Sequence, residues 1–70
     1  MGDRLPALSG KQLAKILQGH GFASVRQRGS HLSMRHAAGR TVTVPLNRVV
    51  PKGTLRSVMR QAGLQRRDLA

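Results

Sequence analysis

The chain has 70 residues and no cysteine, which excludes disulfide bonds and any cysteine-ligated zinc site. Thirteen Lys and Arg residues stand against two Asp and Glu residues, so the formal net charge at pH 7 is +11. No apolar run approaches the ~18 residues that a membrane span needs, and we expect residues 1–70 to form one cytoplasmic domain that does not enter a membrane.

The first element along the chain is a predicted helix over residues 9–20. Ser9 and Gln12 have the spacing of a capping box, in which each side chain accepts a hydrogen bond from the backbone of the other residue. Apolar residues recur at i, i+3 and i+4 from Leu13, which predicts one buried face. Gly21 can adopt the left-handed conformation that commonly ends a helix.

Three short strands are predicted next, over residues 22–27, 31–36 and 41–45. The second and third alternate between apolar and polar residues, as half-buried strands do. The first is less regular, because Phe22 and Val25 do not fall on the same face of a strand with strict alternation.

A second helix is predicted to begin near Gly53 and to end at Gly63. One of its faces is apolar and carries Leu55, Val58, Met59 and Ala62. The tail over residues 65–70 is mostly polar, and we expect it to fray.

This order of elements predicts an α+β fold of the form α-β-β-β-α, with a three-stranded antiparallel sheet. Both helices should cover one face of the sheet, because their apolar stripes must meet the apolar face of the strands. The other sheet face is expected to bind a partner; it carries His31, Ser33, Arg35, Thr41 and Thr43.

The charge favours a polyanionic partner, because the Lys and Arg side chains repel one another in the free protein. Nucleic acid is the first choice, an acidic protein the second and an anionic membrane surface the third. Phe22 is the only aromatic residue, so no platform of rings exists on which single-stranded bases could stack. The two carboxylates, Asp3 and Asp68, lie near opposite ends of the chain, which argues against a two-metal nuclease site. We therefore expect any phosphate chemistry to use neither a metal nor another cofactor.

The segment RQRGSHLSMRH, residues 26–36, gathers the candidate site residues. His31 could act as a general base or acid on a phosphodiester, or it could be an ordinary surface residue at the edge of the core. Arg26, Arg28 and Arg35 are candidates for contacts with phosphates, or they could form a solvated basic face. Ser30 could orient a phosphate, although a role in the turn is the simpler interpretation.

Four blocks of the sequence resemble the HicA (YcfA-like) toxin family in order and spacing: SGKQLAKILQGHGF, VRQRGSH, TVTVP and PKGTLRSVMRQAGL. The resemblance implies a fold like that of double-stranded-RNA-binding domains. It also implies a small ribonuclease that cleaves mRNA and is inhibited by a HicB-like antitoxin. The catalytic histidine of the Gly-Ser-His motif falls on His31. The chain departs from many relatives at Leu32 and at Leu46-Asn47, where those relatives carry further histidines.

The sequence thus predicts an endoribonuclease toxin with His31 as the catalytic residue and Arg26, Arg28, Ser30 and Arg35 as RNA-binding residues. The alternative is a non-catalytic module that binds double-stranded RNA with the same fold and charge. A third possibility is a small basic protein that binds only an acidic protein partner.

Overall fold

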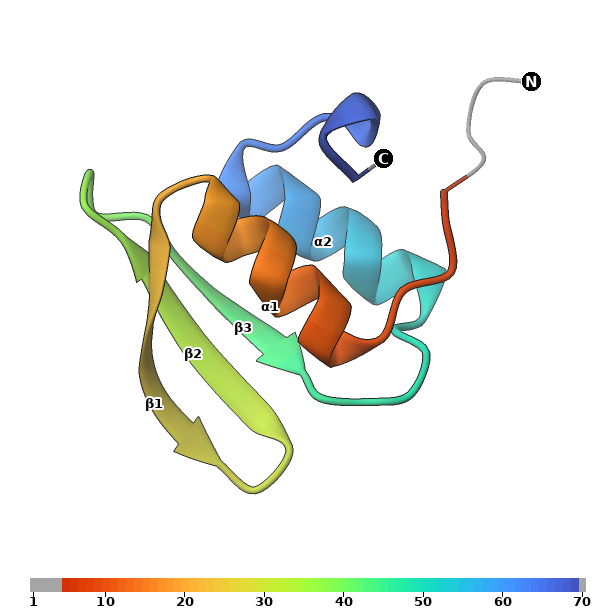
Figure 1. The fold of residues 1–70 in the computed structure, drawn as a ribbon, viewed down its shortest axis with the longest axis horizontal. Coiled ribbons are helices and arrows are strands. Elements are labelled where there is room, and N and C mark those ends of the chain that lie inside the picture. Colours follow the sequence, from red (N-terminus) through yellow and green to blue (C-terminus); the bar gives the residue numbers. More distant parts are fainter. Residues whose placement is uncertain (1–4, 70) are drawn as a thin grey trace.

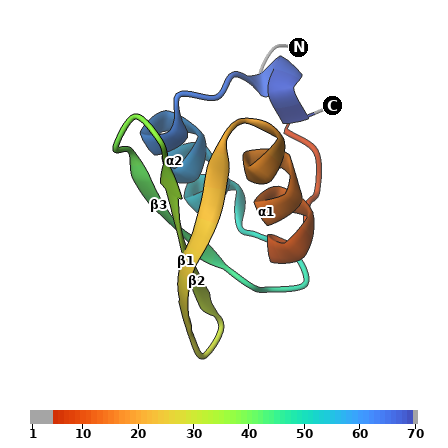
Figure 2. The ribbon, with the colours of Figure 1, turned by 60° about the vertical axis from the view of Figure 1, so that its left-hand side comes forward.

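The computed structural model describes residues 5–69, and its element order confirms the predicted α-β-β-β-α fold. The elements are α1 (Gly10–Gly19), β1 (Phe22–Arg28), β2 (His31–His36), β3 (Thr41–Pro45), α2 (Lys52–Ala62) and a short 3₁₀ helix, η1 (Arg66–Leu69). The strands form one antiparallel sheet in the order β1-β2-β3, and both helices pack against the same face of it (Figures 1 and 2). Neither helix in this part of the chain combines the length and apolarity that a membrane crossing requires.

The start of α1 is fixed by the capping box that the sequence predicts. The N–H of Gln12 donates to Oγ of Ser9 at 3.1 Å, and the N–H of Ser9 donates to Oε1 of Gln12 at 2.9 Å. The helix ends before Gly21, which adopts a positive φ of 92°. Leu13 and Leu17 are fully buried beneath the helix, so both ends and the buried face of α1 follow from local sequence.

Gly10, the first residue of α1, lies directly against the backbone at the end of β3. A Cβ atom on Gly10 would sit 2.2 Å from the carbonyl oxygen of Pro45 and 2.5 Å from Cα of Leu46. The N–H of Gly10 also donates to the carbonyl of Asn47 at 2.8 Å. Only glycine permits this approach, because any side chain would have to displace backbone.

The core lies between the helices and the sheet. Six side chains in it are almost completely inaccessible to solvent: Leu13, Leu17, Met34, Val44, Val50 and Leu55. The alternation predicted for β2 and β3 is confirmed, since Met34, Val42 and Val44 are buried while their neighbours are exposed or half-buried. β1 extends one residue further than predicted, to Arg28, and α2 begins one residue earlier, at Lys52.

The prediction that the tail over residues 65–70 frays is wrong for residues 65–69, and residue 70 lies outside the described residues. Leu69 is only 4% exposed, because it returns to the core as part of η1, which packs against α1. The carboxylate of Asp68 accepts a hydrogen bond from the N–H of Gln65 at 2.7 Å and so closes the turn that precedes η1. Burial of Leu69 and the hydrogen bond of the Asp68 carboxylate thus hold this mostly polar segment against the core.

We predict that Gly10→Ala lowers the free energy of unfolding by about 1–3 kcal/mol, because overpacking against rigid backbone has that cost. In a domain of this size, where the core supplies about 3–5 kcal/mol, the loss should be large enough to measure easily. Chemical denaturation followed by circular dichroism measures it.

Gly19→Ala is the matched control, since a Cβ atom at that position would have no neighbour within 4 Å and the φ of Gly19 is not positive. It should leave stability unchanged or raise it by about 0.4–1 kcal/mol, through the better helix propensity of alanine and the smaller entropy of the unfolded chain. Equal stability of the two variants would contradict the close approach at Gly10.

Candidate functional site

The face of the sheet turned away from the helices, here called the open face, carries polar and basic side chains. In β2 and β3, directly opposed residues share a face: Ser33 pairs with Thr43, and Arg35 pairs with Thr41. His31, at the start of β2, lies on the same face as Ser33 and Arg35 because the three alternate along one strand.

β1 reaches the open face through a β-bulge. Ser24 pairs with Met34 and Arg26 pairs with Ser33, so Val25 is an extra residue with no partner of its own. A bulge of this kind places two residues of one strand opposite one residue of the next and shifts the alternation of side chains by one position.

That shift decides where the arginines of β1 point. Strict alternation from buried Phe22 would place Arg26 and Arg28 on the helix side of the sheet. After the bulge, both lie on the open face, and Val25 is left 60% exposed beside them. The opposite parity of Phe22 and Val25 does not signal this bulge, because strict alternation from Phe22 also places Val25 on the open face.

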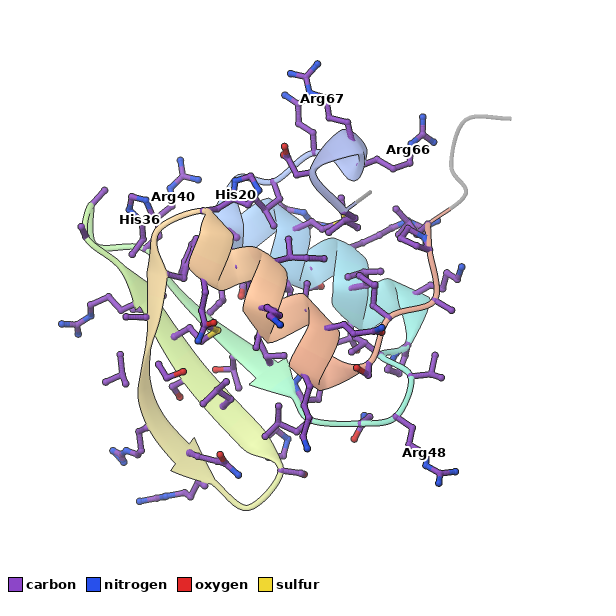
Figure 3. The ribbon with its side chains drawn as sticks, viewed as in Figure 1. His20, His36, Arg40, Arg48, Arg66 and Arg67 are labelled. Atoms are coloured by element: carbon purple, nitrogen blue, oxygen red, sulfur yellow. The ribbon has the colours of Figure 1, made fainter. Side chains whose placement is uncertain are left out.

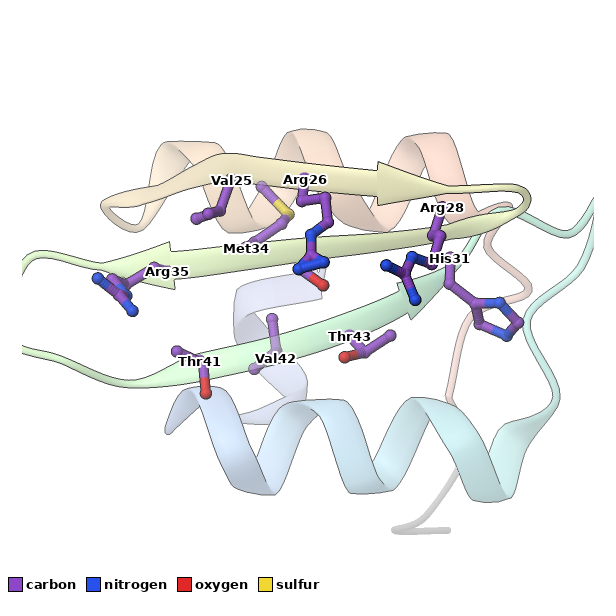
Figure 4. A pocket seen from close by; sticks show the side chains of 10 residues that line it. Val25, Arg26, Arg28, His31, Met34, Arg35, Thr41, Val42 and Thr43 are labelled. Atoms are coloured by element: carbon purple, nitrogen blue, oxygen red, sulfur yellow. The ribbon is translucent and has the colours of Figure 1, made fainter.

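Together the three strands form a shallow groove of about 590 Å³ on the open face. It is lined by Val25, Arg26, Arg28, His31, Ser33, Met34, Arg35, Thr41, Val42 and Thr43. Figure 4 shows Arg26 and Arg28 extending from β1 across the sheet, with His31 at one end of the groove and Arg35 toward the other. The groove therefore has a cationic rim, a floor of small polar side chains and one exposed apolar side chain, Val25.

His31 is held by a two-residue hairpin. Arg28 and His31 are paired across Gly29-Ser30, and Gly29 has a φ of 59°, the conformation that favours glycine at the first position of such turns. The carbonyl of Ser30 accepts a hydrogen bond from the N–H of Leu46 at 2.6 Å, which ties the turn to the end of β3. The imidazole itself is exposed, so it is open to a ligand in the groove.

The structure brings four of the five predicted site residues together in the groove: Arg26, Arg28, His31 and Arg35. Ser30 is not among the groove-lining residues. It is exposed in the turn beside His31, where its backbone carbonyl accepts the hydrogen bond from Leu46.

Three further polar residues line the groove, although they were not among the predicted site residues: Ser33, Thr41 and Thr43. The alternation of side chains along each strand already predicts that these three residues lie on this face. That alternation would have been sufficient to name them as site residues. Their hydroxyl groups can donate to or accept from a ligand that lies along the sheet.

The other two histidines lie elsewhere. Nδ1 of His36 accepts a hydrogen bond from the N–H of Ala38 at 2.9 Å, and its ring packs edge-on against Phe22 with the ring centroids 5.1 Å apart. His20 follows the end of α1 and is exposed. Both line a second groove of about 330 Å³ together with Arg40 and residues at the end of α2, away from the groove of the open face (Figure 3).

None of the described residues places a carboxylate on the open face. Asp68 is the only Asp or Glu among residues 5–69, and it lines the second groove with Arg40. Within residues 5–69, no three His, Asp or Glu side chains come together as metal ligands would. The charge of the groove is thus set by its three arginines, and an anion would meet no opposing group there.

Comparison with known proteins supports one family for this chain. A search of curated proteins finds no match. The model of a protein family described as the HicA toxin of bacterial toxin–antitoxin systems matches residues 10–64, from the first residue of α1 to just beyond α2. The match includes all three strands and every residue that lines the groove of the open face. The chain therefore belongs to the HicA toxin family and is the toxin of a toxin–antitoxin system.

Proposed function

We propose that this toxin is an endoribonuclease that cleaves mRNA, with His31 as its general base or acid. The observation that carries the proposal is the placement of an exposed imidazole at the end of a carboxylate-free groove rimmed by Arg26, Arg28 and Arg35. Such a groove attracts phosphates, and a histidine beside a bound phosphate can transfer protons near neutral pH.

The reaction that suits these groups uses the RNA's own nucleophile. His31 takes the proton from a ribose 2′-OH, and the 2′ oxygen attacks the adjacent phosphorus. The bond from phosphorus to the 5′ oxygen of the next nucleotide breaks, that oxygen takes up a proton from water, and protonated His31 returns its proton to the solvent. The products are a 2′,3′-cyclic phosphate and a 5′-hydroxyl, so the chemistry requires no metal or other cofactor.

Arg28 has the best position to stabilise the charge that develops on the phosphate. It is the direct cross-strand partner of His31, and such partners have Cβ atoms only about 4.5–5.5 Å apart. A guanidinium that contacts the non-bridging phosphate oxygens stabilises the transition state more strongly than the ground state. Arg26 and Arg35 lie further along the groove and bind neighbouring phosphates.

A HicB-like antitoxin is the proposed protein partner. Membership of the family implies an antitoxin. Residues 5–69 contain a single carboxylate, so a partner with acidic side chains would reduce the self-repulsion of this chain. By covering the groove, such a partner would also exclude RNA from His31.

We predict that His31→Ala lowers the rate of RNA cleavage by about 10²–10⁴, as the loss of a general acid or base does. The exposed side chain fills no space in the core, so circular dichroism and most of the RNA affinity should be unchanged. Cleavage by the wild type should persist in EDTA.

His20→Ala is the matched control and should cleave at the wild-type rate, since His20 lies outside the groove. Full activity in folded His31→Ala would overturn the catalytic role. If the wild type binds RNA but cuts none, the non-catalytic RNA-binding module becomes the correct interpretation.

We also predict which arginines set the salt dependence of RNA binding. Each phosphate contact adds about −0.7 to the slope of log K against log[salt] for single strands. The double variant Arg26→Ala/Arg35→Ala should therefore have a slope shallower than that of the wild type by about 1.4.

The control is Arg66→Ala/Arg67→Ala, which removes the same charge from η1, at the opposite end of the molecule from the hairpin (Figures 1 and 3). Its slope should match that of the wild type. Equal changes in the two double variants would show that binding follows net charge and not the groove.

The antitoxin should stabilise the toxin by mass action. At a free antitoxin concentration 100 times Kd, the gain is about 2.7 kcal/mol. In a domain of this size, that gain corresponds to a rise of roughly 10 °C or more in Tm. Thermal melts of the toxin alone and with its cognate antitoxin measure the rise, and identical melting temperatures would contradict the proposed partnership.

A further inference from the structure

The cations of the groove all lie on one side of His31. His31 and Arg28 are paired at the hairpin end of the sheet, and Arg26 and Arg35 follow in the direction away from the turn. Arg26 is opposite Ser33, and Arg35 is opposite Ala23 and Thr41. Figure 4 shows this row, with His31 at its end.

Beyond His31 the described surface has little to hold a phosphate. The sheet ends at the two-residue turn, where Gly29 has no side chain and Ser30 has only a hydroxyl. Arg48 is the only cation on the loop between β3 and α2, and Figure 3 shows it pointing outward from that loop. Lys11 and Lys15 line a separate groove on the helix side of the hairpin.

The spacing of the row fits an extended nucleic-acid strand. Two residue steps along a strand span about 6.8 Å, and the four steps from His31 to Arg35 span about 13 Å. Those lengths are comparable with one and two nucleotides of an extended RNA strand. Apart from the His31 imidazole, the groove offers hydroxyl and guanidinium groups and no Phe, Tyr or Trp ring, so its contacts along the row are with phosphates and sugars and not stacked bases.

We propose that the enzyme contacts its RNA on one side of the cleaved bond only, along the row from Arg28 to Arg35. This inference rests on the proposed endoribonuclease function and specifies the substrate for that site: an extended strand, held by backbone contacts that do not depend on its sequence. Phosphates on the side of Arg26 and Arg35 contribute to kcat/KM, and phosphates on the far side contribute little.

The test uses synthetic DNA oligonucleotides that contain one ribonucleotide. Only that position has a 2′-OH, so only one bond can be cut by the proposed mechanism. A parent with four nucleotides on each side is compared with shorter versions in which nucleotides are removed from the 5′ side or from the 3′ side. Removal on one side should lower kcat/KM by about tenfold or more, whereas removal on the other side should change it less than about threefold.

Two variants connect the sensitive side to the groove. In Arg35→Ala, shortening the sensitive side should have a much smaller effect, because the contact that it removes is already missing. In Arg48→Ala, the matched control on the neighbouring loop, the asymmetry should persist in full.

The outcomes separate the inference from the function on which it rests. A parent oligonucleotide that the wild type does not cut contradicts the proposed mechanism. Cleavage with equal losses from both ends contradicts the one-sided contact alone. An asymmetry that Arg48→Ala abolishes and Arg35→Ala preserves would place the RNA beyond His31 and overturn the inference.

Discussion

The site depends on one irregularity in the sheet, the bulge at Val25. Phe22 must face the helices to complete the core, and six residues later Arg28 must face the opposite way to lie beside His31. An even spacing in a regular strand cannot satisfy both conditions, because side chains alternate with a period of two. The extra residue resolves the conflict, so the same short strand serves the core at one end and the groove at the other.

A second constraint, a chain of backbone contacts that runs from α1 to the turn before β2, holds His31 in place. Gly10 lets the start of α1 lie directly on the backbone of Pro45 and Leu46, and Leu46 donates a hydrogen bond to Ser30 in the turn. The position of His31 is therefore connected through backbone contacts to the first helix. This arrangement gives the proposed general base or acid a defined place, although its imidazole is exposed to solvent.

Several features follow from the sequence alone because they depend on near neighbours. The capping box at Ser9, the buried stripe of α1 and the alternation of β2 and β3 were all predicted and confirmed. The antiparallel α-β-β-β-α fold follows from these elements, since apolar faces must be buried against one another. The charge of +11 likewise predicts a basic face, and the resemblance of the Gly-Ser-His motif to the HicA family points to His31, before any coordinates are considered.

Other features depend on contacts between distant segments, and only the tertiary structure decided them. Arg26 and Arg28 face the groove only because of the register of β1 against β2, whereas strict alternation from Phe22 would place both on the helix side. The ordering of the C-terminus requires Leu69 to meet a core that the tail itself does not encode. The sequence determined which residues carry charge and chemistry, whereas pairing and packing over long range determined which of them share a surface.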